Sequence, residues 1–151
     1  MKKRIVVMTA KDIKFEVKPH QGLGPIEFGM SIADATSLLG TPTEMEEKID
    51  CFDNPFTILT YEEIQTSLFF NGEARALDCI DTTNTACTLN GSKLFSLNLK
   101  QARKLMNNMG FNDIELEYLE DPVEKVMYSI DAGIELYFEK ENLTSIMISS
   151  R

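Results

Sequence analysis

The side chains that could do chemistry in this chain are one histidine, three cysteines and 24 carboxylates. Cys51, Cys79 and Cys87 are odd in number and show no Cys-x-x-Cys spacing, which argues against a zinc site and against a disulfide framework. A single bridge, for example Cys51 to Cys79, stays open if the protein is exported. A nucleophilic triad would have to use His20, which stands in a Pro-His-Gln-Gly loop without a triad signature. These residues therefore predict no catalytic constellation.

The acidic and glycine-containing segments point to no metal or cofactor site either. The run from Glu44 to Asp53 lacks the alternating ligands and the mid-loop glycine of a calcium loop. A carboxylate pair for glycoside hydrolysis could be assembled, but nothing separates such a pair from solvated surface. Gly22, Gly24 and Gly29 are not followed by the Lys-Ser/Thr of a phosphate-binding loop. The sequence predicts no metal and no cofactor.

Composition narrows the class of partner. With 151 residues, 43% hydrophobic and 26% charged, the chain has the make-up of an ordinary globular protein. Its net charge of −9 speaks against nucleic acid, because a phosphate backbone is bound by clustered Lys and Arg. The same charge suits a basic protein partner, and it also serves solubility.

The amino-terminal segment predicts a cytoplasmic protein. The apolar run in MKKRIVVMTAKD is interrupted by Lys11 and Asp12 before it reaches the length of a secretory core. No stretch of about 20 apolar residues could span a bilayer. A periplasmic location, reached through an unrecognised signal, stays open as the alternative.

Residues 24–40 recur in degraded form at residues 91–107, so that Phe28 aligns with Phe95 and Ala35 with Ala102. Self-similarity of this kind is typical of a duplicated unit. We therefore predict an α+β fold of two tandem helix-plus-antiparallel-sheet repeats, whose sheets form a shared or adjacent surface. The predicted division is an N-terminal segment of strands and connector at 1–23, a first repeat at 24–89 and a second repeat at 90–151, with one shared core.

The helices have clear end signals. Ser31 with Asp34, and Asn98 with Gln101, form predicted capping pairs, and glycine follows each apolar stripe. We expect helices at Ser31–Leu39 and Asn98–Met109. Alternating apolar residues, with Asn71-Gly72 as a hairpin signal, predict strands elsewhere. These are 4–8, 13–17, 56–61, 65–71, 75–82, 113–119, 124–130, 134–139 and 143–149.

One sheet face is predicted to lie against the helices and the other to be available for binding. Large side chains on the second face would be the anchors, and carboxylates would form a charged rim. Cover of this face by other parts of the chain is the alternative. The predicted partner-binding residues are Phe69, Tyr137, Met127, Met147, Glu115, Glu117, Glu135 and Glu139.

The run FGMSIADATSLLGTP at residues 28–42 resembles the "GM-Thr/Ser … LLG-x-P" signature of the small outer-membrane-assembly lipoproteins, the SmpA/OmlA family that includes BamE. The helix and strands in tandem also resemble the β-lactamase inhibitor protein superfamily. The resemblance implies a sheet surface that grips another protein. The lipid-attachment cysteine of the lipoproteins is missing here, as are the tryptophans and paired disulfides of the secreted inhibitor.

Together these patterns predict a non-enzymatic protein-binding module, for example an immunity or inhibitor protein that neutralises a toxin or enzyme. Two alternatives stay open: a cell-envelope assembly or scaffold subunit, and an enzyme that works through carboxylates.

Overall fold

The computed structural model describes residues 12–119 and 124–150. Within these ranges the chain is mostly β, with two α-helices and two short 3₁₀ turns. The predicted strand at 4–8 lies outside the described residues. The elements are β1 (Glu16–Lys18), β2 (Gly22–Leu23), β3 (Ile26–Glu27), α1 (Ile32–Leu39), β4 (Glu44–Ile49), β5 (Pro55–Tyr61), η1 (Glu62–Ile64), β6 (Thr66–Asn71), β7 (Ala76–Thr82), β8 (Thr88–Leu89), β9 (Ser92–Lys93), η2 (Leu94–Ser96), α2 (Leu99–Asn108), β10 (Glu115–Leu119), β11 (Glu124–Ser129), β12 (Ile134–Glu139) and β13 (Asn142–Ser149).

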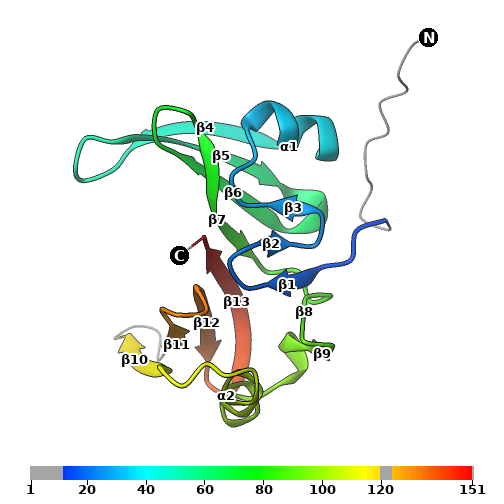
Figure 1. The fold of residues 1–151 in the computed structure, drawn as a ribbon, viewed down its shortest axis with the longest axis vertical. Coiled ribbons are helices and arrows are strands. Elements are labelled where there is room, and N and C mark those ends of the chain that lie inside the picture. Colours follow the sequence, from blue (N-terminus) through cyan, green and yellow to red (C-terminus); the bar gives the residue numbers. More distant parts are fainter. Residues whose placement is uncertain (1–11, 120–123, 151) are drawn as a thin grey trace.

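The largest element is one eight-stranded antiparallel sheet in the order β10-β11-β12-β13-β7-β6-β5-β4. Each half of the chain contributes a four-stranded meander, and the two meanders join where β13 pairs with β7. This pairing gives the last strand of each meander a hydrogen-bonded neighbour, so neither presents an edge. The sheet therefore runs the length of the molecule, with α1 near the β4–β5 end and α2 at the other end (Figure 1).

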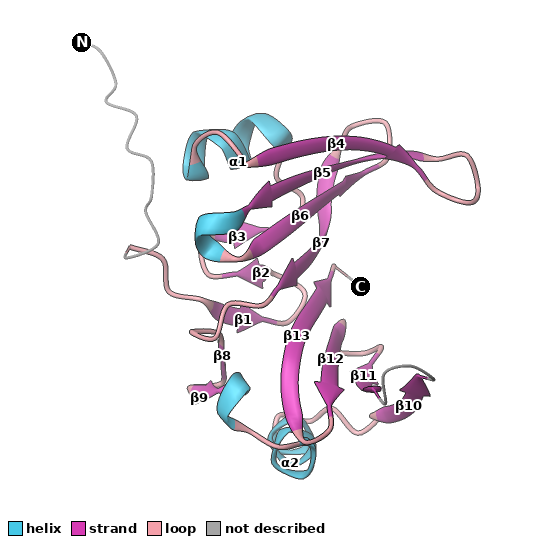
Figure 2. Ribbon diagram, turned by 180° about the vertical axis from the view of Figure 1, so that it is seen from behind, coloured by secondary structure: helices cyan, strands magenta, loops and turns pink. Residues whose placement is uncertain are grey.

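A second sheet of five short strands, in the order β3-β2-β1-β8-β9, also uses both halves of the chain. Its centre is the parallel pairing of β1 with β8, in which Val17 lies opposite Leu89. Gly22 and Gly24 are required at its turns, because an added Cβ would lie 1.9 Å from the Ile26 carbonyl oxygen or 2.2 Å from that of Lys14. Figure 2 shows these short strands beside β7 and β13.

Both helices begin with the capping boxes that the sequence predicts. The Ser31 hydroxyl accepts from the Asp34 amide at 3.0 Å, and the Asn98 side chain accepts from the Gln101 amide at 2.9 Å. Such caps typically contribute about 1 kcal/mol each to helix stability. The Tyr61 hydroxyl donates to the Gly40 carbonyl at 2.9 Å and so ties the end of α1 to β5.

A single hydrophobic core lies between the eight-stranded sheet, the helices and the five-stranded sheet. Its buried cluster includes Ala35 from α1, Ala102 and Met106 from α2, and Phe70 and Phe138 from the two meanders. Because these side chains form one cluster, both helices and the small sheet cover the same face of the large sheet. None of the helices in the described part of the chain is long and apolar enough to cross a membrane.

The predicted fold class, two tandem helix-plus-antiparallel-sheet repeats whose sheets form a shared or adjacent surface, is wrong. The chain is mostly β, and its strands form two sheets that each contain strands from both halves. The prediction treated each helix with the strands that follow it as a module. It missed the pairing of β7 with β13 and of β1 with β8, which depends on contacts between residues far apart in the sequence. The predicted boundaries at 23 and 89 remain a prediction.

Most predicted strands are confirmed to within two residues. The two-residue strands β2, β3, β8 and β9 were not predicted, and the longest omission is β4. Its sequence, EMEEKI, is rich in glutamate and lysine, which have low strand propensity. The strand forms because all six residues pair in register with β5, from Glu44 opposite Thr60 to Ile49 opposite Pro55.

Candidate functional site

The candidate site is the face of the eight-stranded sheet opposite the core, which we call the open face. Antiparallel pairing places directly opposed residues on the same face of a sheet. One row of such residues crosses all eight strands, and none of its members is buried. The row consists of Glu115, Tyr128, Glu135, Met147, Asp81, Ser67, Thr60 and Glu44.

The neighbouring row points the other way. Met127, Leu136 and Ile146 are directly opposed on successive strands, and all are at most 1% exposed. The row continues through Thr82 and Thr66, which are also buried. The contrast between the two rows defines which face is packed and which is open among the described residues.

The open face continues on both sides of this central row. On the β4–β7 side, Cys79, Phe69, Ile58 and Glu46 oppose one another. On the β10–β13 side, Glu117, Val126, Tyr137 and Ser145 do so. Phe69, Ile58, Tyr137 and Met147 are half-buried, so they present apolar surface at the middle of the face.

Seven of the eight predicted site residues lie on this face. Phe69, Met147, Tyr137 and Glu135 lie toward its middle, whereas Glu115 and Glu117 lie on the edge strand β10. Glu139 is at the exposed end of β12 opposite Glu124, away from the central row. The structure thus brings the aromatic and acidic groups together on one surface, whatever that surface binds.

Met127 is the exception, because it is 1% exposed and packs in the core. The predicted strand faces of β11 were inverted: Val126 and Tyr128 lie on the open face instead. In the β11–β12 hairpin, Ser129 is the last residue of β11 and pairs with Ile134. The prediction instead continued the strand to Ile130 and left only residues 131–133 for the turn. A slip of one residue moves every side chain of a strand to the other face.

Two tyrosines on the open face donate hydrogen bonds to carboxylates. The Tyr128 hydroxyl donates to Glu115 Oε2 at 2.7 Å, and the Tyr137 hydroxyl donates to Glu135 Oε2 at 2.6 Å. The bond to Glu115 raises the pKa of Tyr128. Burial, followed by the bond to Glu135, raises the pKa of Tyr137. Both phenols therefore stay protonated at neutral pH and hold their carboxylates as acceptors.

The centre of the open face is electronegative. Burial raises the pKa of Asp81. Burial, and then the nearby charges of Asp78, Asp81 and Glu135, raise the pKa of the Cys79 thiol to about 12. Burial and these carboxylates together make the Cys79 thiolate unfavourable, so the thiol is a poor nucleophile at neutral pH.

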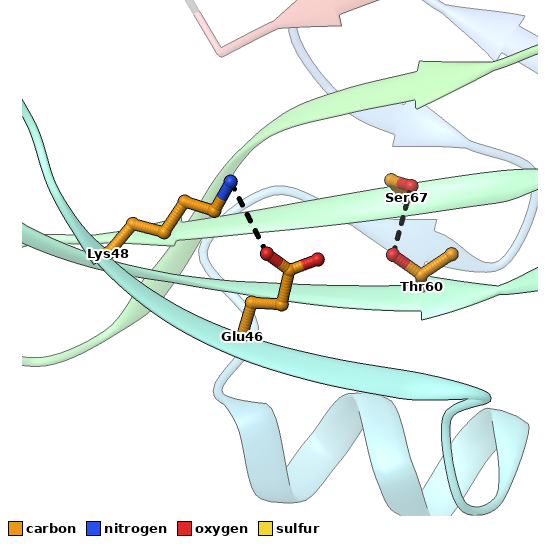
Figure 3. A network of polar contacts seen from close by, with 4 residues as sticks. All are labelled: Glu46, Lys48, Thr60 and Ser67. Carbon is orange, nitrogen blue, oxygen red and sulfur yellow. Dashed lines mark hydrogen bonds and ion pairs between the residues drawn. The ribbon is translucent and has the colours of Figure 1, made fainter.

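Lys48 lies at the β4 edge of the open face, opposite Phe56 and in the row next to that of Glu46. Lys48 Nζ lies 3.3 Å from Glu46 Oε2, and behind this ion pair the Thr60 and Ser67 hydroxyls are 3.3 Å apart (Figure 3). The four carboxylates of the central row, Glu115, Glu135, Asp81 and Glu44, have no cation directly opposite them in the register. The face is therefore suited to a ligand with positive charge.

The surface hollows do not resemble a small-molecule site. Two depressions at the open face measure 250 Å³, beside Ser67 and Asp81, and 190 Å³, beside Tyr128 and Glu135. A larger hollow of 660 Å³ beside the turns that connect β4 to β5 and β6 to β7 is lined by Asp50, Asn54, Pro55, Asn71, Gly72, Glu73 and Asp78. Ligand pockets are usually lined mainly by apolar and aromatic side chains. Within residues 12–119 and 124–150, no group of three or more His, Cys, Asp or Glu could hold a metal ion.

His20 forms a contact between two turns of the fold. Its exposed ring forms a hydrogen bond through Nε2 with the backbone carbonyl of Asp131, which links the β1–β2 turn to the β11–β12 turn. Asp131 in turn donates its amide to Asp113 at 2.9 Å. No nucleophile is among these contacts.

Sequence reasoning missed Asp81, Cys79 and Tyr128 as parts of the open face. The alternation of Ser67 and Phe69 with the buried Leu68 and Phe70 was a usable signal for the first meander. The alternation of residues along β7 could not predict that Asp81 lies beside Met147, because that contact depends on the pairing of β7 with β13.

Comparison with known proteins gives no family. No family model matches the chain, and no curated protein matches it in sequence. A structural comparison matches a crystal structure of an extracellular protein containing an SCP domain from Bacillus anthracis str. Ames, with a TM-score of 0.46 and 9% identity. The match covers 80% of this chain and 43% of that one, so this chain spans less than half of its length. The resemblance to the assembly lipoproteins and the inhibitor superfamily remains a prediction.

Proposed function

We propose that this protein works by binding another protein on the open face and is not an enzyme. The observation that carries the proposal is a row of residues across eight strands, none of them buried, beside a fully packed core row. The partner is a protein with a basic contact surface. The resemblance to an inhibitor superfamily favours an immunity or inhibitor role for such a binder.

The apolar middle of the face would supply most of the affinity. Phe69 and Tyr137 are half-buried aromatic side chains on the two meanders, and Met147 lies on the strand that joins them. Aromatic anchors near the centre of an interface dominate binding free energy, because they bury large area with little loss of conformational freedom. They are already ordered by the sheet, which lowers the entropic cost of binding.

The carboxylates would set specificity and the rate of association. Asp81, Glu135 and Glu115 lie in one row, with the tyrosine hydroxyls orienting two of them. Charged groups around an interface steer a complementary partner and make association depend on salt. Nucleic acid is disfavoured, since the same carboxylates would repel its phosphates.

The test compares Tyr137→Ala with a matched substitution, Tyr118→Ala. Tyr118 is a tyrosine of the same sheet, 66% exposed, on the other face. Each variant and the wild-type protein would be immobilised, exposed to lysate of the source cells, and the retained proteins identified by mass spectrometry. The dissociation constant of the purified partner would then be measured.

We expect a partner that wild type and Tyr118→Ala retain and Tyr137→Ala loses, with affinity weakened by about 2 kcal/mol or more, roughly 30-fold. Asp81→Asn should slow association and flatten its salt dependence. Equal retention by Tyr137→Ala and Tyr118→Ala would refute binding on the open face. Chemical conversion of the bound molecule, lost on Glu135→Gln, would favour the enzyme alternative.

A further inference from the structure

One hollow of the open face lies where η1 joins β5 to β6, next to the end of β7. It measures 250 Å³, and the residues that line it include Thr60, Glu62, Ser67, Asp81 and Thr83. Pockets for drug-sized ligands measure about 300–1,000 Å³, so this hollow suits one side chain better than a whole small molecule. None of the residues that line it is basic.

Asp81 is the residue of this hollow whose charge is left without a partner. Its side chain is half-buried between Ser67 on β6 and Met147 on β13, which lie directly opposite it in the register. No residue that the structure describes donates a hydrogen bond to the Asp81 carboxylate or forms an ion pair with it. Burial accordingly raises the pKa of Asp81. A partly buried carboxylate without a donor is unfavourable, and a bound cation would relieve this.

The hollow offers further acceptors around Asp81. The Thr60 and Ser67 hydroxyls are 3.3 Å apart, so one of them donates to the other (Figure 3). Each hydroxyl oxygen has two acceptor lone pairs, so this pair retains acceptor capacity. Glu62, which is exposed at the start of η1, adds a second carboxylate. A cationic group with several N–H donors would therefore find several acceptors here.

The wall that η1 forms is held in place by hydrogen bonds that do not use these acceptors. The Gln65 carbonyl accepts from the Thr83 amide at 3.0 Å and from the Thr82 hydroxyl at 3.2 Å. The Asn84 side chain donates to the Ile64 carbonyl at 3.0 Å. The hollow is therefore ordered before a ligand arrives, which lowers the entropic cost of binding.

We propose that this hollow receives an arginine side chain, whose guanidinium group binds the Asp81 carboxylate. The inference rests on the proposed function, because the arginine is taken to belong to the protein that binds the open face. Arginine suits the hollow better than lysine does. Guanidinium is more weakly hydrated than ammonium, so it loses less on entering a half-buried site, and its five N–H donors can serve the carboxylate and the hydroxyls together. The apolar stem of the arginine would lie against Met147, opposite Asp81, and Phe69, one row away.

The test is a nuclear magnetic resonance titration of the isotope-labelled protein with N-acetyl-arginine amide. Concentrations up to about 20 mM are needed, because one side chain in an open hollow binds in the millimolar range. Sodium chloride is lowered as the probe is added, so that the ionic strength stays constant. N-acetyl-citrulline amide has nearly the same shape without the charge, and N-acetyl-lysine amide has the charge without the planar group.

We expect the arginine probe to shift the amide signals of residues 60–67 and 81–83 in a saturable way. The lysine probe should bind more weakly, and the citrulline probe should shift none of these signals. Asp81→Asn should weaken binding of the arginine probe about tenfold or more. Glu139→Gln is the matched control, because it removes one negative charge at an exposed position of the same sheet, away from the central row. It should change the affinity by less than about twofold.

A stability measurement separates a binding role of Asp81 from a structural one. Burial raises the pKa of Asp81, so its charged form is disfavoured in the folded protein. Asp81→Asn should therefore leave the midpoint of thermal unfolding unchanged or raise it. A lower midpoint would mean that the carboxylate already has a favourable partner within the fold, which would overturn the inference. Affinity for the arginine probe should also fall as pH falls through the folded pKa of Asp81.

Three outcomes of the titration would overturn the inference. These are equal shifts with the arginine and citrulline probes, tighter binding of the lysine probe, and an Asp81→Asn variant that binds the arginine probe as wild type does.

The partner retained in the immobilisation experiment separates this inference from the proposed function. If Tyr137→Ala loses the partner and Asp81→Asn keeps full affinity, the open face binds protein without an arginine in the hollow, and only this inference fails. If the arginine probe binds in the hollow while Tyr137→Ala and Tyr118→Ala retain the partner equally, the proposed function fails and the guanidinium site stands.

Discussion

Thr57 provides a sharp test of how the core is packed. It lies on β5 opposite Phe70, is 0% exposed, and its hydroxyl has no hydrogen-bond partner among the described residues. Burying a hydroxyl without a partner costs about 1–3 kcal/mol. Valine keeps the branched shape and the strand propensity, and it replaces the hydroxyl by a methyl group that gains about 0.8 kcal/mol on burial.

We therefore expect Thr57→Val to raise the free energy of unfolding by about 1–2 kcal/mol. This is the lower part of the range for an unpartnered hydroxyl, because the surrounding core is packed around a hydroxyl and must adjust to a methyl group. At this chain length the midpoint of thermal unfolding should rise by about 2–6 °C. Urea denaturation followed by circular dichroism, in reducing buffer, measures the first quantity, and a thermal scan measures the second.

Thr66→Val is the matched control, since Thr66 is also a buried strand residue, 2% exposed. Its hydroxyl donates to the Ile64 carbonyl at 2.8 Å and contacts the Thr82 hydroxyl at 2.9 Å. The same substitution should there lower the free energy of unfolding by about 1–3 kcal/mol. If Thr57→Val is neutral or destabilising, the Thr57 hydroxyl is satisfied in solution, for example by an enclosed water, and the reasoning fails.

Three further predictions follow from the same structure. Met127→Ala should lower the free energy of unfolding by about 2–5 kcal/mol in urea denaturation, because the side chain is 1% exposed; a negligible loss would place it on the surface. Hydrogen bonds from Ser129 and then from the amide of Asp131 lower the pKa of Asp113, so its contribution to stability is present above the unfolded pKa and is lost as pH falls through the folded one. Asp113→Asn should therefore destabilise most at neutral pH, with the difference shrinking toward acid, and a pH-independent difference would contradict this. At pH 8 iodoacetamide should label exposed Cys51 well before Cys79, whose thiol pKa is raised to about 12; peptide mass spectrometry that finds equal rates would refute the assignment.

The candidate site was predictable in part. Phe69, Tyr137 and Glu135 were assigned to one face because their strands alternate clearly between apolar and polar residues. The strand KVMYS of β11 was not assigned correctly, because both of its phases contain large apolar side chains. The pairing of Ser129 with Ile134 sets which of the two sets of side chains faces the core.

What the sequence determined by itself was local. The capping pairs at Ser31 and Asn98 placed both helices, and turn residues such as Asn71-Gly72 placed the hairpins, because these signals act between residues a few positions apart. Tertiary structure alone decided that β7 pairs with β13, that β1 pairs with β8, and that the glutamate-rich β4 is a strand. The physical reason is that each of these depends on hydrogen bonds and burial offered by another part of the chain. Those partners give one register its advantage over the next, and they do so only once the chain has folded.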